Sequence, residues 1–374
     1  MIGAPRGGPA DVADADAEAP PALDVGAHHL VRQVLSDVTT FSAEGSAIRC
    51  GQARPLLPLQ APPDEHHRLR SRLEATLAPS AIAGLEPLVR SRAAALLDDL
   101  AATGGGDGNA RYSRLLPVGV LVDLLGLPPG DLDLVRELHD GVLRLRRDDD
   151  PRDHPAQFGR RIYAYFGPIV AARRRHPGVD LLSRLLVADG PGDPLTDEEV
   201  VDTAYTLLLA SIAPAAEALS CTLALLAADG ALDGTEQGGG LGARGAIEEL
   251  LRWGSPVKAI VRLATGAAVV GGADVADGAR VSCDLAAANH DPAVFPDPDR
   301  FDPARRTSAH VAFGAGPHRC IGAYLARVEL RITIEEVRRR LANLALAPVG
   351  GPPRSPAERR ASEPLLLRCD PVGA

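Results

Sequence analysis

Apolar residues recur at helical spacing over most of the chain, and this pattern predicts a mainly helical protein. Residues 64–77 place Leu69, Leu73 and Leu77 on one helical face. The same kind of pattern predicts helices at 31–35, 82–102, 115–125, 131–147, 156–176, 179–188, 246–253 and 322–341. Short apolar runs predict strands at 258–264, 267–270 and 280–285. Many helices with a small, late set of strands indicate an α+β fold that is mostly α.

The longest predicted helix begins near Thr196 and continues to about Ala228. Thr196 and Glu199 have the spacing of a capping box, in which each side chain accepts a hydrogen bond from the other residue's backbone N–H. The segment is apolar on most faces, so we expect it to cross the middle of the core. Pro214 lies in its interior, where a proline removes a backbone hydrogen bond at a cost of about 3 kcal/mol.

The composition narrows the class of protein. Hydrophobic residues make up 45% of the 374 residues, enough for a sizeable core, and the net charge of −9 argues against a nucleic-acid partner. Residues 1–22 lack periodicity and predict a disordered lead-in, which leaves 23–374 as a single domain. A basic segment followed by an apolar run is absent at the front, and no uncharged apolar stretch reaches about 18 residues. We therefore expect a cytoplasmic protein without a signal peptide or a membrane partner.

The cysteines do not suggest a disulfide framework or a zinc site. They are odd in number, widely separated and without a CxxC spacing, which favours a reducing compartment. They are Cys50, Cys221, Cys283, Cys320 and Cys369.

Cys320 stands out because of its neighbours. It lies in the string from Phe313 to Gly322, Phe-Gly-Ala-Gly-Pro-His-Arg-Cys-Ile-Gly, just ahead of a predicted helix. Glycines allow a tight loop to approach a flat ligand, and the free N–H groups at a helix N-terminus favour a thiolate. A lone cysteine is more often an inert small hydrophobe, so the surrounding string carries the argument.

This string resembles the haem-binding loop of the cytochrome P450 family, Phe-x-x-Gly-x-x-x-Cys-x-Gly, at every fixed position. The resemblance extends over about residues 23–369. It implies a cytochrome P450 fold with a long central helix over haem b and a small β region. It also implies that Cys320 is the axial ligand of the iron, the metal site, and that Phe313, Gly314 and Gly322 shape the haem loop. A thiolate ligand of this kind favours cleavage of the O–O bond.

Further segments resemble the family in the same order. Glu249 and Arg252 match its Glu-x-x-Arg pair, which implies a structural ion pair joined by Arg300. Four other residues match the groups that bind the two haem propionates, which need cationic or N–H donors once they are buried. These residues are His66, Arg70, Arg262 and His318.

The long helix departs from the family's oxygen-binding stretch. The family's glycine, acid and alcohol are replaced by Ser211, Ala213 and Pro214, so the usual proton delivery to bound oxygen is missing. Pro214 has no N–H and leaves the carbonyl of Ala210 without its helical donor. We expect that carbonyl, Ser211 or a hydroxyl group of the substrate to relay protons instead. Glu217 lies one turn beyond Ala213 on the same face.

The resemblance implies a monooxygenase or oxidative tailoring enzyme that acts on a small, natural-product-like molecule. The alternatives are a haem-dependent peroxygenase, a non-oxidative isomerase or dehydratase, and a non-catalytic haem-binding scaffold. A ferredoxin-type electron donor is expected to dock on the Cys320 side, near Arg70, Arg72 and Arg327. Small or aliphatic residues are expected to face an apolar substrate, and Lys258 could pair with an acidic group. The expected substrate-facing residues are Ile212, Ala213, Ala259 and Ile260.

Overall fold

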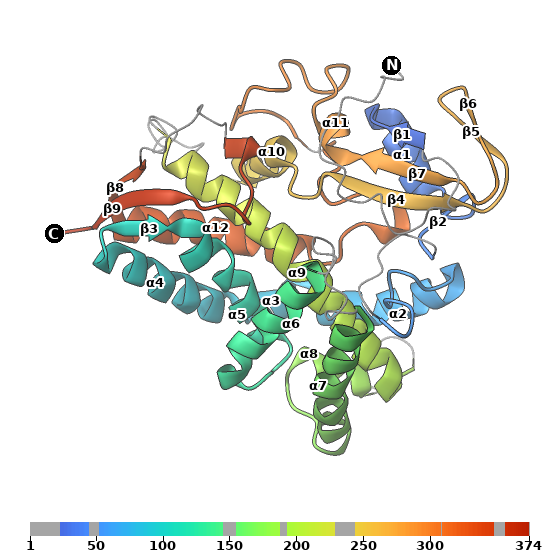
Figure 1. Cartoon of the computed structure of the whole chain (residues 1–374), viewed down its shortest axis with the longest axis horizontal. Coiled ribbons are helices and arrows are strands. Elements are labelled where there is room, and N and C mark those ends of the chain that lie inside the picture. The colour runs from blue at the N-terminus through green and yellow to red at the C-terminus, as the bar shows by residue number, and fades with distance from the viewer. Residues whose placement is uncertain are drawn as a thin grey trace.

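The computed structural model describes residues 23–44, 52–144, 155–187, 193–228, 244–307, 309–347 and 356–373. The lead-in predicted at 1–22 and Cys50 lie outside these ranges. Helices gather around one long central helix, and a small sheet lies beside them (Figure 1). The prediction of an α+β fold that is mostly α is confirmed.

The longer helices follow the predicted ranges closely. α2 (Pro63–Thr76) and α5 (Leu115–Leu124) begin and end within one residue of the prediction. The remaining predicted helices are α1 (His28–Ser36), α4 (Glu86–Ala102), α6 (Leu132–Arg144), α7 (Pro155–Arg175), α8 (Leu181–Leu186), α10 (Arg244–Gly254) and α12 (Ala323–Arg340). Two short helices were not predicted: α3 (Pro79–Ala83) is separate from α4 although one helix was expected from residue 82 to 102, and α11 (Leu285–Asn289) directly follows the strand predicted at 280–285.

α9 (Asp197–Leu226) is the central helix, as its apolar sequence predicts (Figure 1). The capping box is present: the Glu199 N–H donates to Thr196 Oγ1 at 3.2 Å and the Thr196 N–H donates to Glu199 Oε2 at 2.8 Å. The helix continues through Pro214 and packs against α5, α7 and α12. By length and composition it could also cross a membrane, but 56% of its most apolar stretch is buried inside the protein, which is typical of a core helix.

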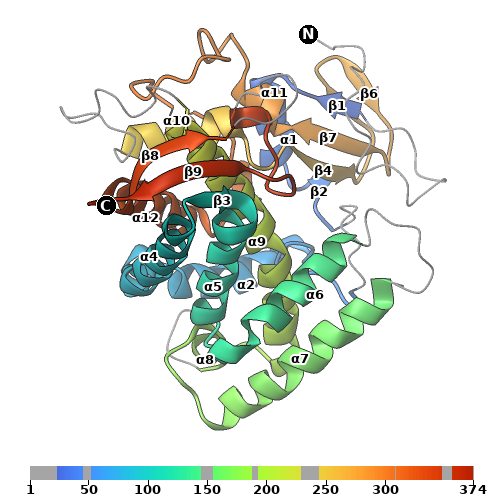
Figure 2. The same cartoon turned by 60° about the vertical axis from the view of Figure 1, so that its left-hand side comes forward.

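The strands form three small sheets. The first has the order β1 (Leu23–Val25), β7 (Arg280–Asp284), β4 (Ala259–Ala264) and β2 (Phe41–Ser42), with β1 parallel to β7 and the other pairs antiparallel. The second has the order β3 (Gly105–Asp107), β9 (Leu366–Pro371) and β8 (Leu341–Leu346). It lies near α4 and α12, on the opposite side of α9 from the first sheet (Figure 2). β5 (Ala268–Val270) and β6 (Ala273–Val275) form a hairpin.

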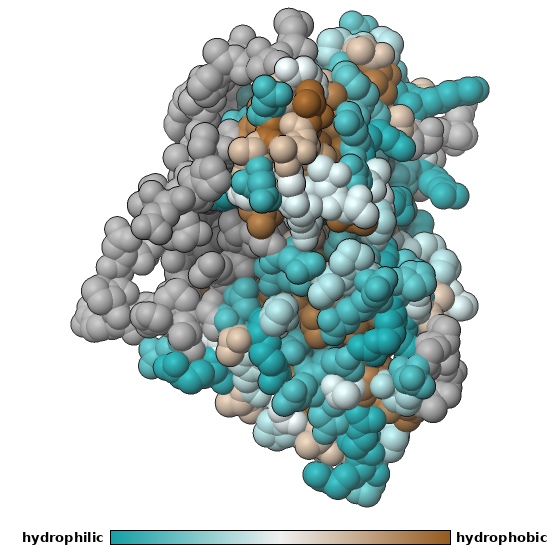
Figure 3. Space-filling model, turned by 90° about the vertical axis from the view of Figure 1, so that its right-hand side faces the viewer, coloured by the Kyte–Doolittle hydropathy of each residue, from teal (hydrophilic) through white to brown (hydrophobic). Residues whose placement is uncertain are grey.

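The face of the molecule that carries α2 and the β5–β6 hairpin has an apolar part and a hydrophilic part. Apolar residues gather in its upper part, and its lower part is mostly hydrophilic (Figure 3). The hairpin contributes Val269, which is 59% exposed. Val269 is therefore one exposed apolar residue that the sheet region contributes.

Two buried clusters divide the core, and the loop around Cys320 contacts both. Phe313 and Ile321 pack against the large helical cluster. Val311 and Ala315 belong to the smaller cluster around the first sheet and α1. The loop is therefore held at the junction of the helical and β regions.

Candidate functional site

The loop that carries Cys320 is closed by backbone hydrogen bonds. The Cys320 N–H donates to the Phe313 carbonyl at 2.8 Å, and the Arg319 N–H donates to the Gly316 carbonyl at 3.0 Å. Gly316 has a φ of +69°, and a Cβ there would lie 2.4 Å from the carbonyl oxygen of Leu35 in α1. Glycine at 316 therefore allows α1 and the loop to pack closely.

The Cys320 side chain is exposed and lies two residues before Gly322, which caps the N-terminus of α12. Protein atoms still surround much of the sulfur, and this desolvation raises the pKa of the thiol. The Gly322 N–H and nearby arginines oppose the increase without cancelling it. The helix N-terminus alone therefore does not make the thiolate the favoured form. A bound metal cation would remove the proton outright.

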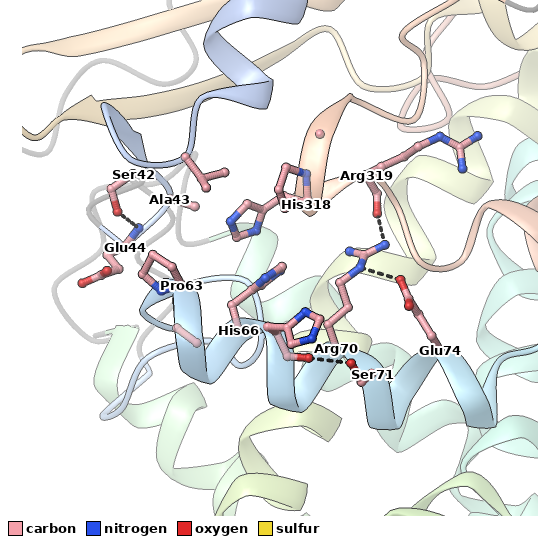
Figure 4. A pocket seen from close by; sticks show the side chains of 15 residues that line it. Ser42, Ala43, Glu44, Pro63, His66, Arg70, Ser71, Glu74, His318 and Arg319 are labelled. Carbon is pink, nitrogen blue, oxygen red and sulfur yellow. Dashed lines mark hydrogen bonds and ion pairs between the residues drawn. The ribbon is translucent and has the colours of Figure 1, made fainter. Parts of the chain in front are cut away.

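Basic side chains from separate segments meet beside this loop (Figure 4). The rings of His66, from α2, and His318, from the loop, have centroids 4.0 Å apart. Arg70, one turn beyond His66, donates from Nη2 to the Arg319 carbonyl at 2.6 Å and pairs through Nε with Glu74 at 2.7 Å. Three residues predicted from two widely separated motifs are thus brought together.

Arg262, on β4, completes this group. Its positive charge acts on both His66 and His318, and the residue is 3% exposed. Within the described ranges, its Nη1 donates to the Val261 carbonyl at 3.0 Å and its Nε has no hydrogen-bond partner. A buried guanidinium with so few partners is costly unless an anion is bound nearby.

The basic group fits a ligand with two carboxylates. Burial is the main cause that lowers the pKa of His318 to about 3 and also lowers that of His66, so both rings are neutral at physiological pH and can donate N–H bonds. His66, Arg70 and His318 line a cavity of about 530 Å³. Haem has two propionates, and the donors here match them in kind.

Glu249 and Arg252 on α10 form the predicted ion pair. Arg252 Nε lies 2.7 Å from Glu249 Oε2, and both side chains are fully buried. The prediction that Arg300 joins this pair is wrong. Arg305 Nε lies 3.1 Å from Glu249 Oε1, whereas Arg300 offers only its backbone carbonyl, 3.4 Å from Arg252 Nη2. Residues 290–307 are mostly irregular, so their turns decide which arginine reaches α10, and no sequence period could have indicated it.

An accessible stripe interrupts the buried length of α9. Residues 200–206 and 218–226 are buried, but eight residues between them are partly or fully exposed, and five of these lie at helical spacing and form one stripe. These residues are Leu207, Ala210, Ser211, Pro214 and Glu217. Since most of the rest of α9 is buried, this accessible stripe is a candidate surface for a bound ligand.

The predicted proton-handling residues lie on or beside this stripe. Ser211 Oγ donates to the Leu207 carbonyl at 2.7 Å. Pro214 lacks an N–H, so the carbonyl of the exposed Ala210 has lost its regular helical donor. Ala213 is partly exposed at the edge of the stripe.

Ile212 does not line the stripe. It is 3% exposed and packs in the helical core, so its predicted role in contacting the substrate is wrong. Its position on the helix is nearly opposite the centre of the stripe, because successive residues turn by about 100°.

β4 presents one face to the Cys320 loop. A Cβ on Gly314 would lie 3.7 Å from Ile260 Cδ1. Successive strand residues point to opposite faces, so Ile260 and Arg262 share this face and Ala259 points away from it. Lys258, just before β4, has the same parity as Ile260.

The arginines expected to attract a redox partner are mostly engaged. Arg72 is 2% exposed and donates to the carbonyls of Arg184 and Val187, so its predicted place on the docking surface is wrong. Arg327 pairs with Glu248, with Nε 2.5 Å from Oε1. Arg319, next to Cys320, is exposed and was not predicted for this role.

Known proteins resemble this chain over most of its length. Residues 243–356 match the family model for cytochrome P450. Erythromycin C-12 hydroxylase of Saccharopolyspora erythraea is 33% identical, over 85% of this chain and 82% of that protein. Mycinamicin IV hydroxylase/epoxidase of Micromonospora griseorubida is 34% identical, over 83% of this chain and 77% of that protein. A cytochrome P450 structure from Chondromyces apiculatus superposes with a TM-score of 0.80 at 30% identity, over 94% of this chain and 90% of that one.

The fold and the sequence similarity define the class, and this chain belongs to the cytochrome P450 family. It is a haem-iron monooxygenase that acts on a small molecule. The prediction of family, fold and enzyme class is confirmed.

Proposed function

We propose that this enzyme oxidises a natural-product-like molecule at haem b, with Cys320 as the axial ligand of the iron. The observation that carries the proposal is the exposed thiol of Cys320 beside a buried basic group with few anionic partners. The relatives add support, since they include erythromycin and mycinamicin hydroxylases and a nocardicin C N-oxygenase from Nocardia uniformis.

Different groups of residues would hold different parts of the cofactor site. His66, Arg70, Arg262 and His318 would bind the propionates through charged or N–H donors. Phe313, Gly314 and Gly322 would shape the loop around the thiolate. Glu249, Arg252 and Arg305 would fix the irregular segment that leads into this loop. Residues 23–374 would form the single catalytic domain.

Bound haem with a thiolate ligand supplies oxygen activation. Atoms of α9 would bind the water that delivers the protons this chemistry needs. The Ala210 carbonyl can accept a hydrogen bond from water, and the Ser211 hydroxyl oxygen can accept another while its proton bonds Leu207. Water held at these two atoms would replace the acid and alcohol that Ala213 and Pro214 lack.

The axial ligand is tested by the absorption spectrum of the reduced, carbon monoxide-bound protein. We expect the strongly red-shifted Soret band that marks thiolate ligation in wild type, and its loss in Cys320→His. Cys369→Ser is the matched control, because Cys369 lies on β9 in the second sheet. A wild-type spectrum without the thiolate band would contradict the proposal.

The proton relay is tested by the double variant Ala213→Glu, Pro214→Thr. If water on Ala210 and Ser211 is the native relay, this change will alter the fraction of reducing equivalents lost as peroxide. Coupling is measured as product formed per electron donor consumed. Unchanged coupling together with unchanged turnover would rule the relay out.

A ferredoxin is the proposed electron donor, and the cytoplasm is the proposed location. The docking surface would lie over the exposed Arg319, beside Cys320, since Arg72 is buried and Arg327 is paired. Long-range attraction between such a cation and an acidic partner weakens as salt rises.

A further inference from the structure

Lys258 is the single lysine among the chain's 40 lysine and arginine residues. It lies between the end of α10 and the start of β4 and is partly buried. Its Nζ donates to the Gly254 carbonyl at 2.8 Å. Burial, followed by the charge of Arg360, lowers the pKa of this ammonium group. The chain therefore has a compact, partly desolvated ammonium group at this position, whereas its other strongly basic side chains are all arginines.

Lys258 and Arg360 are two cations that repel each other, and within the described part of the chain neither forms an ion pair. Among the described residues, neither has a carboxylate oxygen within 4.0 Å. Each interacts electrostatically with Glu217, the last residue of the accessible stripe on α9. Glu217 accepts a hydrogen bond from the Ala361 N–H at 3.0 Å, which fixes it beside Arg360.

Other acidic groups near the cluster are already engaged. Asp284 acts on Lys258 more weakly than Arg360 does, and its Oδ1 accepts the Ala287 N–H at the start of α11. Glu363, which acts on Glu217, has another partner. The pair of cations is thus the part of the cluster that still offers N–H donors.

Two observations relate the cluster to the accessible stripe on α9 and to the Cys320 loop. Glu217 is three residues beyond Pro214 on the accessible stripe. Lys258 shares the strand face of Ile260, which approaches Gly314 in the Cys320 loop. A ligand that lies along the stripe would therefore have these charged groups at one end.

We propose that Lys258 and Arg360 form an anion subsite that binds a carboxylate of the substrate. A carboxylate accepts hydrogen bonds from both cations and relieves their mutual repulsion. Glu217 borders the subsite and limits it to a group with a single negative charge. The inference rests on the proposed function, since it assigns the chemical class of substrate for that site.

The single lysine allows a direct test that does not depend on turnover. Reductive methylation with isotope-labelled formaldehyde marks Lys258 and the chain's α-amine, and the second signal is an internal control. The reduced, carbon monoxide-bound enzyme is titrated with phenylbutanoate and, separately, with the neutral phenylbutanol. We expect the carboxylate to shift the Lys258 resonance and leave the α-amine resonance unchanged. Equal shifts with the acid and the alcohol would overturn the proposal.

Variants of Lys258 measure how much its positive charge contributes to binding of the acid. Lys258→Met keeps the length of the side chain and removes its charge, so we expect phenylbutanoate to bind about tenfold more weakly, the loss of one charge-assisted hydrogen bond. Binding of phenylbutanol should change little, and Lys258→Arg should retain the preference for the acid. If wild type bound phenylbutylamine more tightly than the acid, the negative charge of Glu217 would determine which ligand the site prefers, and the proposal would fail.

The two proposals fail in distinguishable ways. A missing thiolate band in the carbon monoxide spectrum contradicts the haem-thiolate site, whatever the labelled lysine shows. An intact band with no selective response of Lys258 contradicts only the anion subsite.

Discussion

Glu329 on α12 is a carboxyl group buried in the core. Its residue is 5% exposed, and its Oε2 has no hydrogen-bond partner in the part of the chain that the structure describes. Burial raises the pKa of this carboxyl to about 8, so the folded protein keeps it protonated at neutral pH. The unfolded chain loses that proton near the ordinary value of 4.5. Stability is therefore lost as the pH rises from about 4.5 to about 8.

Glu329→Gln should remove this loss because glutamine does not titrate. We expect the variant to be more stable than wild type at pH 7, by up to roughly 3 kcal/mol at about 1.4 kcal/mol per pKa unit, and the two to converge in acid. Urea unfolding across this pH range measures the difference. Glu335→Gln on the same helix is the control with the opposite sign, because Arg90 and Arg331 overcome burial and hold the pKa of Glu335 low. Parallel pH profiles for wild type and Glu329→Gln would contradict the expectation.

Single residues were predictable where their chemistry is local. Cys320, Phe313 and Gly322 belong to one continuous string, and Glu249 and Arg252 lie one helical turn apart. Ile212 was wrongly predicted because the direction it faces depends on how α9 is rotated in the core. No short-range sequence pattern determines that rotation.

At the scale of the elements, the position of the irregular segment before the Cys320 loop depends on the contacts of one arginine, Arg305. Arg305 reaches the buried Glu249 and also donates from Nη2 to the Asp297 carbonyl at 3.0 Å. Arg305→Gln should lower the stability of the fold by about 3 kcal/mol, as expected when one partner of a buried charge pair is removed. Arg300→Gln should have little effect, because the Arg300 side chain is exposed.

Thermal unfolding of these two variants decides between the arginines. A larger loss in Arg300→Gln than in Arg305→Gln would restore the original prediction. Equal losses would mean that Arg305 holds the segment no more firmly than Arg300 does.

Helices were predictable as elements and most extra strands were not. Capping residues and apolar periodicity lie within each helix, so α2 and α5 matched to within one residue. β3 has the sequence Gly-Gly-Asp, which carries no strand pattern, and it exists because it pairs with β9 more than 250 residues away. Long-range pairing of this kind leaves no local signal.

At the scale of the whole molecule, the buried basic group should couple haem binding to folding. Arg262 is a buried cation with few partners in the described chain, so it opposes folding of the haem-free protein and favours the haem-bound one. Arg262→Met should raise the melting temperature of the haem-free protein and lower that of the loaded protein. Scanning calorimetry of both forms measures the two shifts. Shifts of the same sign in both forms would contradict a propionate role for Arg262.

The close contact of Gly316 with α1 also limits how this protein can change over generations. A Cβ at 316 would lie 2.4 Å from the Leu35 carbonyl oxygen and 2.7 Å from the Ser36 Cα, and the φ of +69° disfavours other residues. The neighbouring Pro317 and Arg319 are exposed and free of this constraint. In a library randomised over this loop, surviving variants should diversify at 317 and 319 while keeping glycine at 316. The loop can therefore acquire new surface chemistry without losing the position of its cysteine.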